Sequence, residues 1–431
     1  MFPNPQDALP LPPRPNLEQY KKLARDLVNA GKSGDPQAIR LWATQWVTKL
    51  AELSSSDLAT ARVAQVAEFA QSRMFSEASR GALSHAQFVI ARSHGFESWP
   101  KFQKHIGELR HANSHISNFE AAADAIVSGD IAKLELLLTA QPDLVHQRSS
   151  REHRATLLHY VSANGIENFR QKTPKNAAQI AELLLRARSE VDAEADVYGG
   201  GATTLGLVAT SVHPERAGVQ ESLMETLLRG GANIDCHCGN CLSIVSSSLA
   251  NGRVGAAEFL AAAGARLDIE AAAGLGKMDV LKTHFDHVGV RNATELQVSR
   301  GFLLACEYGR NHVVEFLLQQ GIDINTQADT GLGGLHCAVI GGQLETIGIL
   351  LAHGASLGAK NRYDGTALGQ AMWSAIYGDS PTDYIPLLEA LLSAGSLIEE
   401  GSLAWIERQP RGSSALKSRM IDLFRRHGAK S

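Results

Sequence analysis

A period of 33 residues is the feature of this sequence that most constrains its fold. Gly354 follows Gly321 at this spacing, and Leu335 follows Phe302 at the same spacing. Two further glycine pairs repeat it, Gly231 with Gly264 and Gly395 with Gly428. One short unit of this kind cannot bury its apolar side chains alone. A regular period of this length therefore indicates stacked units that bury those side chains against their neighbours.

Each unit follows one pattern of small, apolar and turn-forming residues. Ala305 and Ala338 are small residues of a first short helix, which we expect to pack closely on its neighbours. A glycine that can adopt the left-handed conformation ends this helix. A second helix carries an apolar pair such as Leu350 and Leu351, and another glycine ends it. The polar residues that follow, such as 361–365, predict a hairpin that projects from the stack.

Two short motifs accompany the period. The first helix starts with TLLH at 156–159, and the second helix ends with leucine-leucine-x-x-glycine-alanine at 350–355. Weaker copies of the first motif occur at 203–206, 333–336 and 366–369, and the second motif also occurs at 227–232 and 391–395. In period and motifs the chain resembles the ankyrin-repeat family over residues 118–431. The resemblance implies an all-α, ankyrin-like helical repeat solenoid with short hairpin fingers, of about eight units plus a C-terminal capping turn.

Three units are longer than this pattern requires. In a regular unit, 19 residues separate the opening Leu335 from the closing Gly354. The units that close at Arg188, Gly231 and Gly395 carry insertions of 11, 7 and 8 residues. All three insertions are predicted to lengthen the connection between the two helices of a pair.

One hairpin is missing from the array. Only four residues separate Gly264 from Ile269, which is too short a stretch for a projecting finger. The next unit therefore restarts abruptly at 269–282. We expect the solenoid to consist of two blocks that meet near residue 269.

The residues before the array lack the 33-residue period. Residues 1–15 are rich in proline and predict an extended lead-in. Residues 16–112 predict a small domain of about four or five helices, the first of which begins with a capping pattern at Asn16 and Gln19. The stretches RPNLEQYKKLARDL and AQFVIARSHGFESWPKF resemble a leader segment of bacterial ankyrin-repeat proteins. This second resemblance implies a bacterial origin.

The composition argues against several classes of function. The net charge of −4 comes from 41 basic and 45 acidic residues, so the chain has no general attraction to nucleic acid or anionic membranes. No run of about 18 apolar residues occurs, so no helix is expected to span a membrane. The five cysteines are an odd number, and three of them lie within six residues. This arrangement is not a disulfide framework and predicts a cytoplasmic location.

Residues 85–107 offer one alternative function, DNA binding by a helix-turn-helix. Ala91 and Gly95 have a spacing compatible with that motif. However, Pro100 falls inside the helix that would read the DNA, and the few basic residues there are mixed with Glu97. Plain packing of two helices is therefore favoured, and DNA binding is the weaker alternative.

Three cysteines share one predicted hairpin, at Cys236, Cys238 and Cys241, and His237 lies among them. A structural zinc site needs four ligands, and this motif supplies three thiols with His237 awkwardly placed as the fourth. The spacing of 238–241 also matches a redox dithiol, but such motifs usually lie at the start of a helix. Other units form this hairpin without any cysteine. We therefore predict no bound metal or other cofactor here, with a metal site and a dithiol as alternatives.

The repeat register also gives two histidines a defined position within their units. His159 and His336 fall at the start of first helices, and the resemblance implies that each bonds its own backbone and braces a hairpin. No serine-histidine-aspartate arrangement and no phosphate-binding loop is placed credibly by the register. The sequence therefore favours a protein that is not an enzyme.

The hairpin tips and first helices of such an array form a concave face that, in the resembling family, binds other proteins. Tyrosine, tryptophan and arginine are the usual anchors of protein interfaces. The positions predicted to be exposed there and to contact a partner protein are Trp373, Tyr363, Arg362, Tyr308, Glu307, Ile340 and His153. We therefore predict a non-catalytic protein-binding scaffold. The alternative is an enzyme or small-ligand binder with a pocket formed by the repeat insertions.

Overall fold

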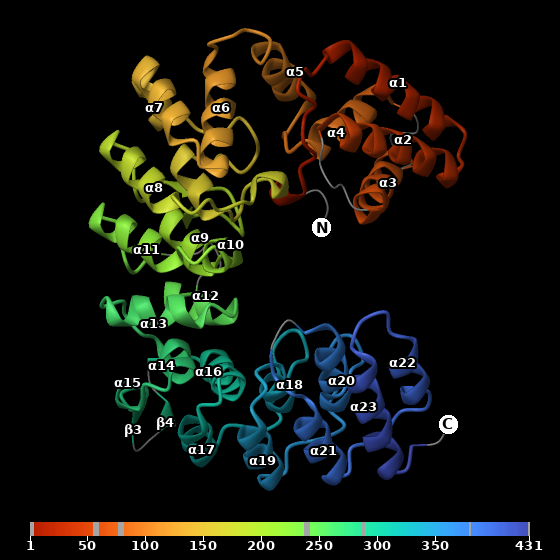
Figure 1. Ribbon diagram of the computed structural model, residues 1–431, viewed down its shortest axis with the longest axis vertical. Coiled ribbons are helices and arrows are strands. Elements are labelled where there is room, and N and C mark those ends of the chain that lie inside the picture. Colours follow the sequence, from red (N-terminus) through yellow and green to blue (C-terminus); the bar gives the residue numbers. More distant parts are fainter. Residues whose placement is uncertain are drawn as a thin grey trace. The chain divides into compact units, whose positions relative to one another are not determined.

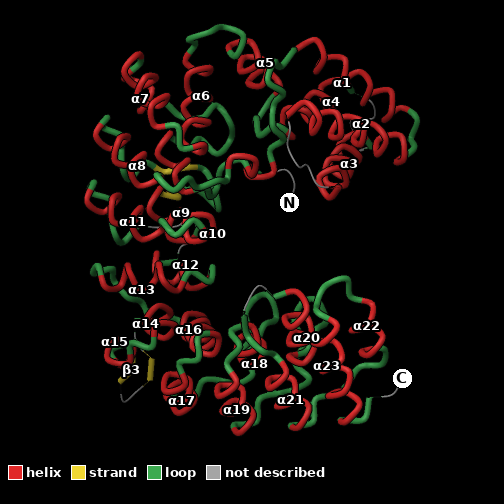
Figure 2. Tube along the Cα trace, in the orientation of Figure 1, coloured by secondary structure: helices red, strands yellow, loops and turns green. Residues whose placement is uncertain are grey.

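Helices dominate the structure, a computed structural model that describes residues 4–54, 60–75, 82–236, 242–286, 289–290, 292–378 and 381–429. The only strands among these residues are two antiparallel pairs of two residues each, which confirms the all-α repeat fold (Figures 1 and 2). The chain divides into two compact units, Met1–Phe259 and Leu260–Ser431, which we call the N-terminal and C-terminal bodies. Within the described residues, no helix is both long and apolar enough to cross a membrane.

Five α-helices form the first part of the N-terminal body: α1 (Leu17–Lys32), α2 (Pro36–Ser54), α3 (Thr60–Met74), α4 (Leu83–Ser93) and α5 (Trp99–Glu108). Asn16 begins α1, because its side-chain oxygen accepts a hydrogen bond from the Glu18 backbone N–H at 3.0 Å. The apolar faces of these helices meet in one core, which contains Leu27, Trp46 and Phe102.

The lead-in before α1, which includes the short 3-10 helix η1 (Pro5–Asp7), packs on these helices. The Leu9 side chain is fully buried. Its backbone N–H donates to the Ser93 carbonyl at 2.7 Å, and its own carbonyl lies 3.0 Å from Nδ1 of His94. Both polar groups of this extended residue are therefore bonded inside the core, which holds the lead-in on the helices.

The rest of the N-terminal body is a stack of helix pairs. The first helices of the pairs are α6 (His115–Ser128), η3 (Leu157–Ser162), α9 (Thr204–Thr210) and α12 (Ile244–Ala250). The second helices are α7 (Ile131–Ala140), α8 (Ala177–Arg186), α11 (Gln220–Arg229) and α13 (Val254–Ala262). The connections contain η2 (Pro142–His146), η4 (Asn168–Arg170), α10 (Val212–Arg216), and the strands β1 (Glu194–Ala195) and β2 (Ala202–Thr203). Since η4 and α10 lie between the two helices of a pair, these two insertions are where the sequence predicts them.

The C-terminal body continues the same arrangement. Its first helices are α14 (Ile269–Leu275), α16 (Glu295–Glu307), α18 (Gly334–Ile340), α20 (Ala367–Tyr377) and α22 (Ser402–Arg408). Its second helices are α15 (Met278–Lys282), α17 (Asn311–Gln319), α19 (Leu344–Ala352), α21 (Ile385–Ser393) and α23 (Ser414–Arg426). The strands β3 (Phe285–Asp286) and β4 (Gly289–Val290) form the hairpin after α15.

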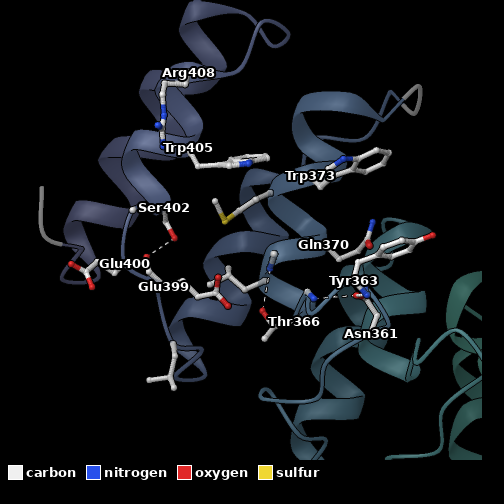
Figure 3. Close-up of a pocket in the computed structure, with 16 residues that line it drawn as sticks. Asn361, Tyr363, Thr366, Gln370, Trp373, Glu399, Glu400, Ser402, Trp405 and Arg408 are labelled. Atoms are coloured by element: carbon white, nitrogen blue, oxygen red, sulfur yellow. Dashed lines mark hydrogen bonds between the residues drawn. The ribbon is translucent and has the colours of Figure 1, made fainter. Parts of the chain in front are cut away.

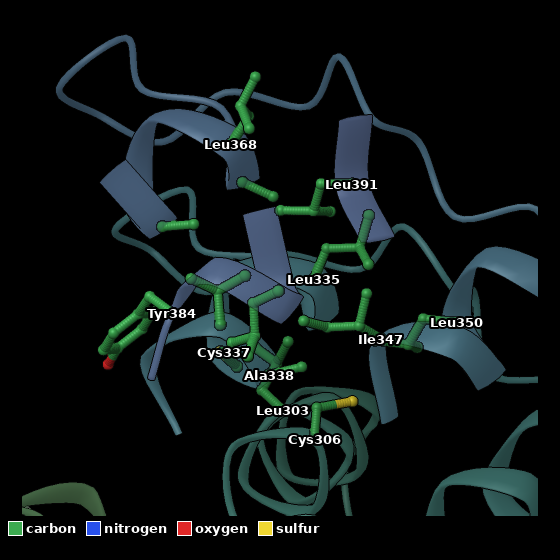
Figure 4. Packing of buried hydrophobic residues seen from close by; sticks show 14 of the residues in the cluster. Leu303, Cys306, Leu335, Cys337, Ala338, Ile347, Leu350, Leu368, Tyr384 and Leu391 are labelled. Atoms are coloured by element: carbon green, nitrogen blue, oxygen red, sulfur yellow. The ribbon is translucent and has the colours of Figure 1, made fainter. Parts of the chain in front are cut away.

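First helices pack on first helices, and second helices on second helices. In the C-terminal body α18 lies between α16 and α20, and α19 lies between α17 and α21. Ala305 and Ala338 are fully buried, as expected of small residues where helices approach closely. The larger side chains of Leu335, Ile347 and Leu350 fill the space between the two layers (Figure 4). Each such burial stabilises the stack by about 1.5–3 kcal/mol.

Glycine is required where helices end and the chain reverses. Gly354 lies just after the end of α19 and has a φ of +83°, in the left-handed region. A Cβ at Gly354 would meet no atom within 4 Å, so only backbone strain opposes a side chain there. At Gly309 the φ is +64° and a Cβ would lie 2.3 Å from the side chain of Gln343. A side chain at Gly309 would therefore also require the end of the flexible Gln343 side chain to move.

The two histidines brace hairpins as the resemblance implies. Nδ1 of His336 accepts a hydrogen bond from the Gly333 N–H at 3.3 Å, and its Nε2 donates to the Gly365 carbonyl at 3.0 Å. His159 makes the equivalent bonds to Thr156 and to the Ala202 carbonyl. Burial lowers the pKa of His159 to about 4, so a neutral ring serves both bonds. The structural role predicted for these histidines is confirmed.

Candidate functional site

A groove with a volume of about 790 Å³ lies in the C-terminal body, between the hairpin and first helix of one repeat and those of the next. One wall consists of the hairpin before α20 and the exposed side of α20. The other wall consists of the turn 397–401 and α22. Tyr363 and Trp373 line the groove on the first wall, and Trp405 and Arg408 line it on the second (Figure 3).

The hairpin that carries Tyr363 is held by Asn361. The side-chain oxygen of Asn361 accepts hydrogen bonds from the N–H groups of Tyr363 at 2.9 Å and Gly365 at 3.1 Å. The Arg362 N–H donates to the carbonyl of Thr330 in the preceding hairpin at 2.9 Å. These bonds fix the turn while the Tyr363 ring remains 81% exposed. A rigid hairpin that exposes an aromatic ring is suited to contact a partner.

Helix α20 positions Trp373. The Thr366 side chain begins the helix by accepting a hydrogen bond from the Gly369 N–H at 3.3 Å. Because α-helical neighbours recur three and four residues apart, Gln370, Trp373 and Tyr377 share one side of α20. The rings of Trp373 and Tyr377 stack with centroids 5.6 Å apart. Trp373 remains 52% exposed, so its indole offers apolar surface to the groove.

The opposite wall begins at a sharp turn. Gly401 has a φ of +84°, and its carbonyl accepts from the Trp405 N–H at 2.8 Å. The Ser402 hydroxyl donates to the Glu399 carbonyl at 2.7 Å. This turn exposes the carboxylates of Glu399 and Glu400 at the rim of the groove (Figure 3).

The groove is therefore apolar and aromatic at its centre and charged at its rim. Two indoles, one phenol ring and the side chains of Leu397 and Met372 line it. Leu397 is 86% exposed, which is unusual for a large aliphatic side chain. The hydrogen bonds among the described lining residues belong to turns and helix starts. This arrangement can bury an apolar side chain of a partner and attract a cation.

Some of the predicted contact residues line or adjoin the groove, and the others lie outside it. Trp373 and Tyr363 line the groove, and Arg362 lies exposed beside Tyr363 with its guanidinium 5.6 Å from the ring centroid. Tyr308 and Ile340 are partly buried at the ends of α16 and α18, outside this groove.

Glu307 is a further predicted contact residue that lies outside the groove, at the last position of α16. It is only partly exposed. Burial raises the pKa of its carboxyl to about 7. At neutral pH the side chain is therefore a mixture of the charged and neutral forms.

The prediction that His153 is exposed is wrong. His153 is completely buried in the N-terminal body, and its Nε2 lies 3.4 Å from the carboxylate of Glu167. It belongs to a buried ionic network in which the Arg151 guanidinium contacts Glu120 at 2.6 Å and Glu167 at 3.0 Å. Arg170 completes the network at 2.7 Å from Glu120. The insertion after η3 folds over this hairpin and removes it from the surface.

Charge pairing controls the ionisation of this network. Burial by itself would raise the pKa of Glu120, but Arg151 and Arg170 outweigh burial and lower the pKa to about 2. The same balance holds the pKa of Glu167 well below its ordinary value, with Arg151 and His153 as the partners. Both carboxylates are therefore ionised at neutral pH.

Cys236 was predicted to lie on a projecting hairpin, but its side chain is buried. Its side chain is only 4% exposed, and burial raises the pKa of its thiol. The other candidate ligands, His237, Cys238 and Cys241, lie outside the described residues. Among the residues that the structure describes, no cluster of three or more metal-ligating side chains occurs.

Sequence reasoning missed Trp405, Arg408 and Leu397. Trp405 belongs to the stretch SLAWIE, which starts the first helix after the hairpin at 396–401. Its place next to α20 follows from the repeat register. The sequence signal was therefore present, but it required the last helix pair to be treated as a full repeat.

Comparison with known proteins agrees with this repeat architecture. Residues 302–398 match the family model described as ankyrin repeats (3 copies), so this part of the chain consists of ankyrin repeats. No curated protein matches the chain. One similar solved structure is the ankyrin repeat domain of Bcl-3, described as a unique member of the IkappaB protein family. The match has 19% identity and a TM-score of 0.30, and it covers 58% of this chain and 92% of that one.

Proposed function

We propose that the protein is a non-catalytic binding scaffold whose groove between α20 and α22 holds an exposed segment of another protein. Ankyrin repeats generally mediate protein–protein interactions, and residues 302–398 carry them. The observation that supports this groove is the pair Trp373 and Trp405, which come from neighbouring repeats and line one depression. Tryptophan and tyrosine bury large apolar areas with few rotatable bonds, so they are frequent anchors of interfaces.

The rim of the groove suggests the chemistry of the partner segment. Glu399 and Glu400 are adjacent in the lining, and Arg408 is the cation among the lining residues. The acidic pair favours a lysine or arginine of the partner by electrostatic attraction. We therefore infer a segment with an apolar or aromatic side chain for the indoles and a basic residue beside it.

The alternatives have less support among the described residues. DNA binding through 85–107 would need a basic face, but the exposed Lys101 is paired with Glu97, and Phe102 and Ile106 of the same helix are buried. An enzyme that uses nucleophilic catalysis would need a nucleophile and a base within hydrogen-bond reach of each other. The bonds of the groove instead form turns and helix starts, as for Asn361 and Thr366.

Peptide display tests this proposal. Random peptides displayed on phage are selected against the full chain, and the affinity of each selected peptide is then measured by calorimetry. We expect selected peptides to combine an aromatic or aliphatic residue with a basic residue. Trp373→Ala and Trp405→Ala should each weaken binding by about 1 kcal/mol or more.

The matched control is Leu136→Ala, which removes an apolar side chain that is 72% exposed on α7. It should leave peptide affinity unchanged. Selected peptides that bind the two tryptophan variants as tightly as the parent protein would contradict the assignment of this groove.

A further inference from the structure

A second pocket lies in the N-terminal body, where the connections after three successive first helices meet. Its volume is about 570 Å³, which is within the range of small-molecule pockets. Asn164 and Gln171 come from the connection after η3, Ser211 and His213 from the connection after α9, and Asn251 from the connection after α12. Two of these connections are the insertions that lengthen the repeats.

The wall after η3 is anchored on its other side by the buried ionic network. Between Asn164 and Gln171 lie Glu167 and Arg170, and both are inside that network. The Arg170 Nε also donates to the carboxylate of Asp124 at 2.8 Å. The network therefore holds the loop that carries two of the lining side chains.

The other two walls are fixed by specific hydrogen bonds. The buried Gln220 side chain donates to the carbonyls of Val208 at 2.9 Å and Ser211 at 3.2 Å, which fixes the start of the second insertion. The Arg253 Nε donates to the Asn251 carbonyl at 2.9 Å, and the guanidinium also pairs with Glu215. This ion pair joins the second insertion to the next repeat.

Two of the seven described non-glycine residues with a positive φ lie beside the pocket. Ala163 and Tyr198 have φ values of 48° and 53°, in the left-handed region that costs a residue other than glycine about 1–2 kcal/mol. The Tyr198 hydroxyl donates to the Asn164 side chain at 2.6 Å and accepts a hydrogen bond from Gln6. Strain of this kind persists where the surrounding structure enforces it, and it is often found at binding sites. Here it holds the Tyr198 ring, which is 49% exposed, at the edge of the pocket.

The lining presents both acceptors and donors for hydrogen bonds. Gln171 donates its amide to the Ile166 carbonyl and Asn251 donates its amide to the Ser247 carbonyl, which identifies the side-chain oxygen of each. Neither oxygen accepts a hydrogen bond from the described residues, and the His213 ring forms none with them. Burial, with Arg216 nearby, lowers the pKa of His213, so its neutral ring offers one donor and one acceptor at neutral pH.

We propose that this pocket binds a small neutral polyhydroxylated molecule, such as a monosaccharide or a cyclic polyol. Hydroxyl groups donate and accept, and so they match a lining that mixes amide oxygens with the Ser211 hydroxyl and the His213 ring. The ionised oxygens of a phosphate or carboxylate only accept, and they would face the amide oxygens unfavourably. The cation of the lining, Arg253, is already paired with Glu215. The Tyr198 ring supplies an apolar surface for the C–H face of a sugar ring.

Ligand titration of the full chain tests this proposal. The neutral probes are D-glucose, D-galactose and myo-inositol, and the anionic probes are D-glucose 6-phosphate and inorganic phosphate. Binding is followed by calorimetry and by saturation-transfer NMR at ligand concentrations up to about 20 mM. We expect at least one neutral probe to bind with one site per chain. Asn251→Ala and His213→Ala should each weaken that binding by about fivefold or more.

The control variant is His353→Ala, because His353 is an exposed histidine of the C-terminal body. It should bind the same probe with unchanged affinity, and circular dichroism should report the same helix content for all three variants. Three outcomes would overturn the proposal. They are binding of the anionic probes alone, no binding of any neutral probe, and affinity that does not change in either pocket variant.

Discussion

Arg151 donates to the carboxylate of Glu120 at 2.6 Å, and both side chains are buried. The same guanidinium lies 3.0 Å from the Glu167 carboxylate and 5.5 Å from the centre of the Phe96 ring. Glu120 belongs to α6, Glu167 to an insertion, and Phe96 to the turn before α5. One side chain therefore joins the N-terminal helices, the first repeat and the insertion of the next.

Removal of this guanidinium should strongly destabilise the N-terminal body. Arg151→Met leaves the buried Glu120 with Arg170 alone, and the buried Glu167 with His153 and the more distant Arg170. Loss of one member of a buried ion pair costs about 3–5 kcal/mol. Urea unfolding of the full chain measures the change. Lys101→Met is the control, because it breaks an exposed pair with Glu97 and should cost less than about 1 kcal/mol. Equal losses in the two variants would show that the buried network contributes no more than a surface ion pair.

The buried carboxylate of Glu120 should also make the free energy of unfolding depend on pH in the acidic range. The pKa of Glu120 is lowered from 4.5 to about 2, so the unfolded chain takes up this proton at a higher pH than the folded chain. Its stabilising contribution is therefore present above pH 4.5 and is lost as the pH falls towards 2. We expect urea midpoints to decrease through this window, and less steeply in Glu120→Gln. An identical slope in the variant would contradict the lowered pKa.

The carboxyl of Glu307 should have the opposite dependence on pH. Burial raises its pKa to about 7, so the folded chain keeps this proton at a pH where the unfolded chain has lost it. Its favourable contribution is present below pH 4.5 and is lost as the pH rises through 7. Glu307→Gln should therefore have a higher free energy of unfolding than the parent protein at a pH above 7. At low pH the two proteins should be similar. Thermal unfolding across this range measures the difference, and a variant that is less stable at high pH would refute the assignment.

A side chain at Gly354 should destabilise the stack through backbone strain alone. The left-handed φ of +83° disfavours any β-branched residue, whereas a Cβ would meet no neighbouring atom. Gly354→Val should cost about 1–2 kcal/mol or more. Gly348→Val is the matched control, because Gly348 lies inside α19 without a positive φ and also has free space around it. Its cost should be smaller, and a melting curve of Gly354→Val that matches the parent protein would contradict the helix-end assignment.

Local pattern in the sequence was sufficient for the repeat architecture. Small residues, apolar pairs and glycines act over a few positions, so Ala338 and Gly354 could be assigned to a helix contact and a helix end without coordinates. The bracing roles of His159 and His336 were implied by the resemblance to the ankyrin-repeat family, once the register had placed both residues at the start of first helices. The insertions could be located in the same way. Counting the residues between the opening and closing motifs of a unit shows which units are longer than the pattern requires.

Contacts between segments far apart in the chain were beyond such reasoning. His153 occupies a hairpin position that is exposed in a regular repeat, but the insertion that carries Glu167 covers it. Residues of the N-terminal helices reach the same hairpin, where Nδ1 of His105 lies 2.8 Å from the Ser150 hydroxyl. The groove likewise depends on Trp405 and Trp373, which are brought together by the stacking of two repeats. Periodicity constrains which side of its own helix a residue occupies. Whether that side is buried or forms a site depends on which other segments pack against it. Only the tertiary structure decides that packing.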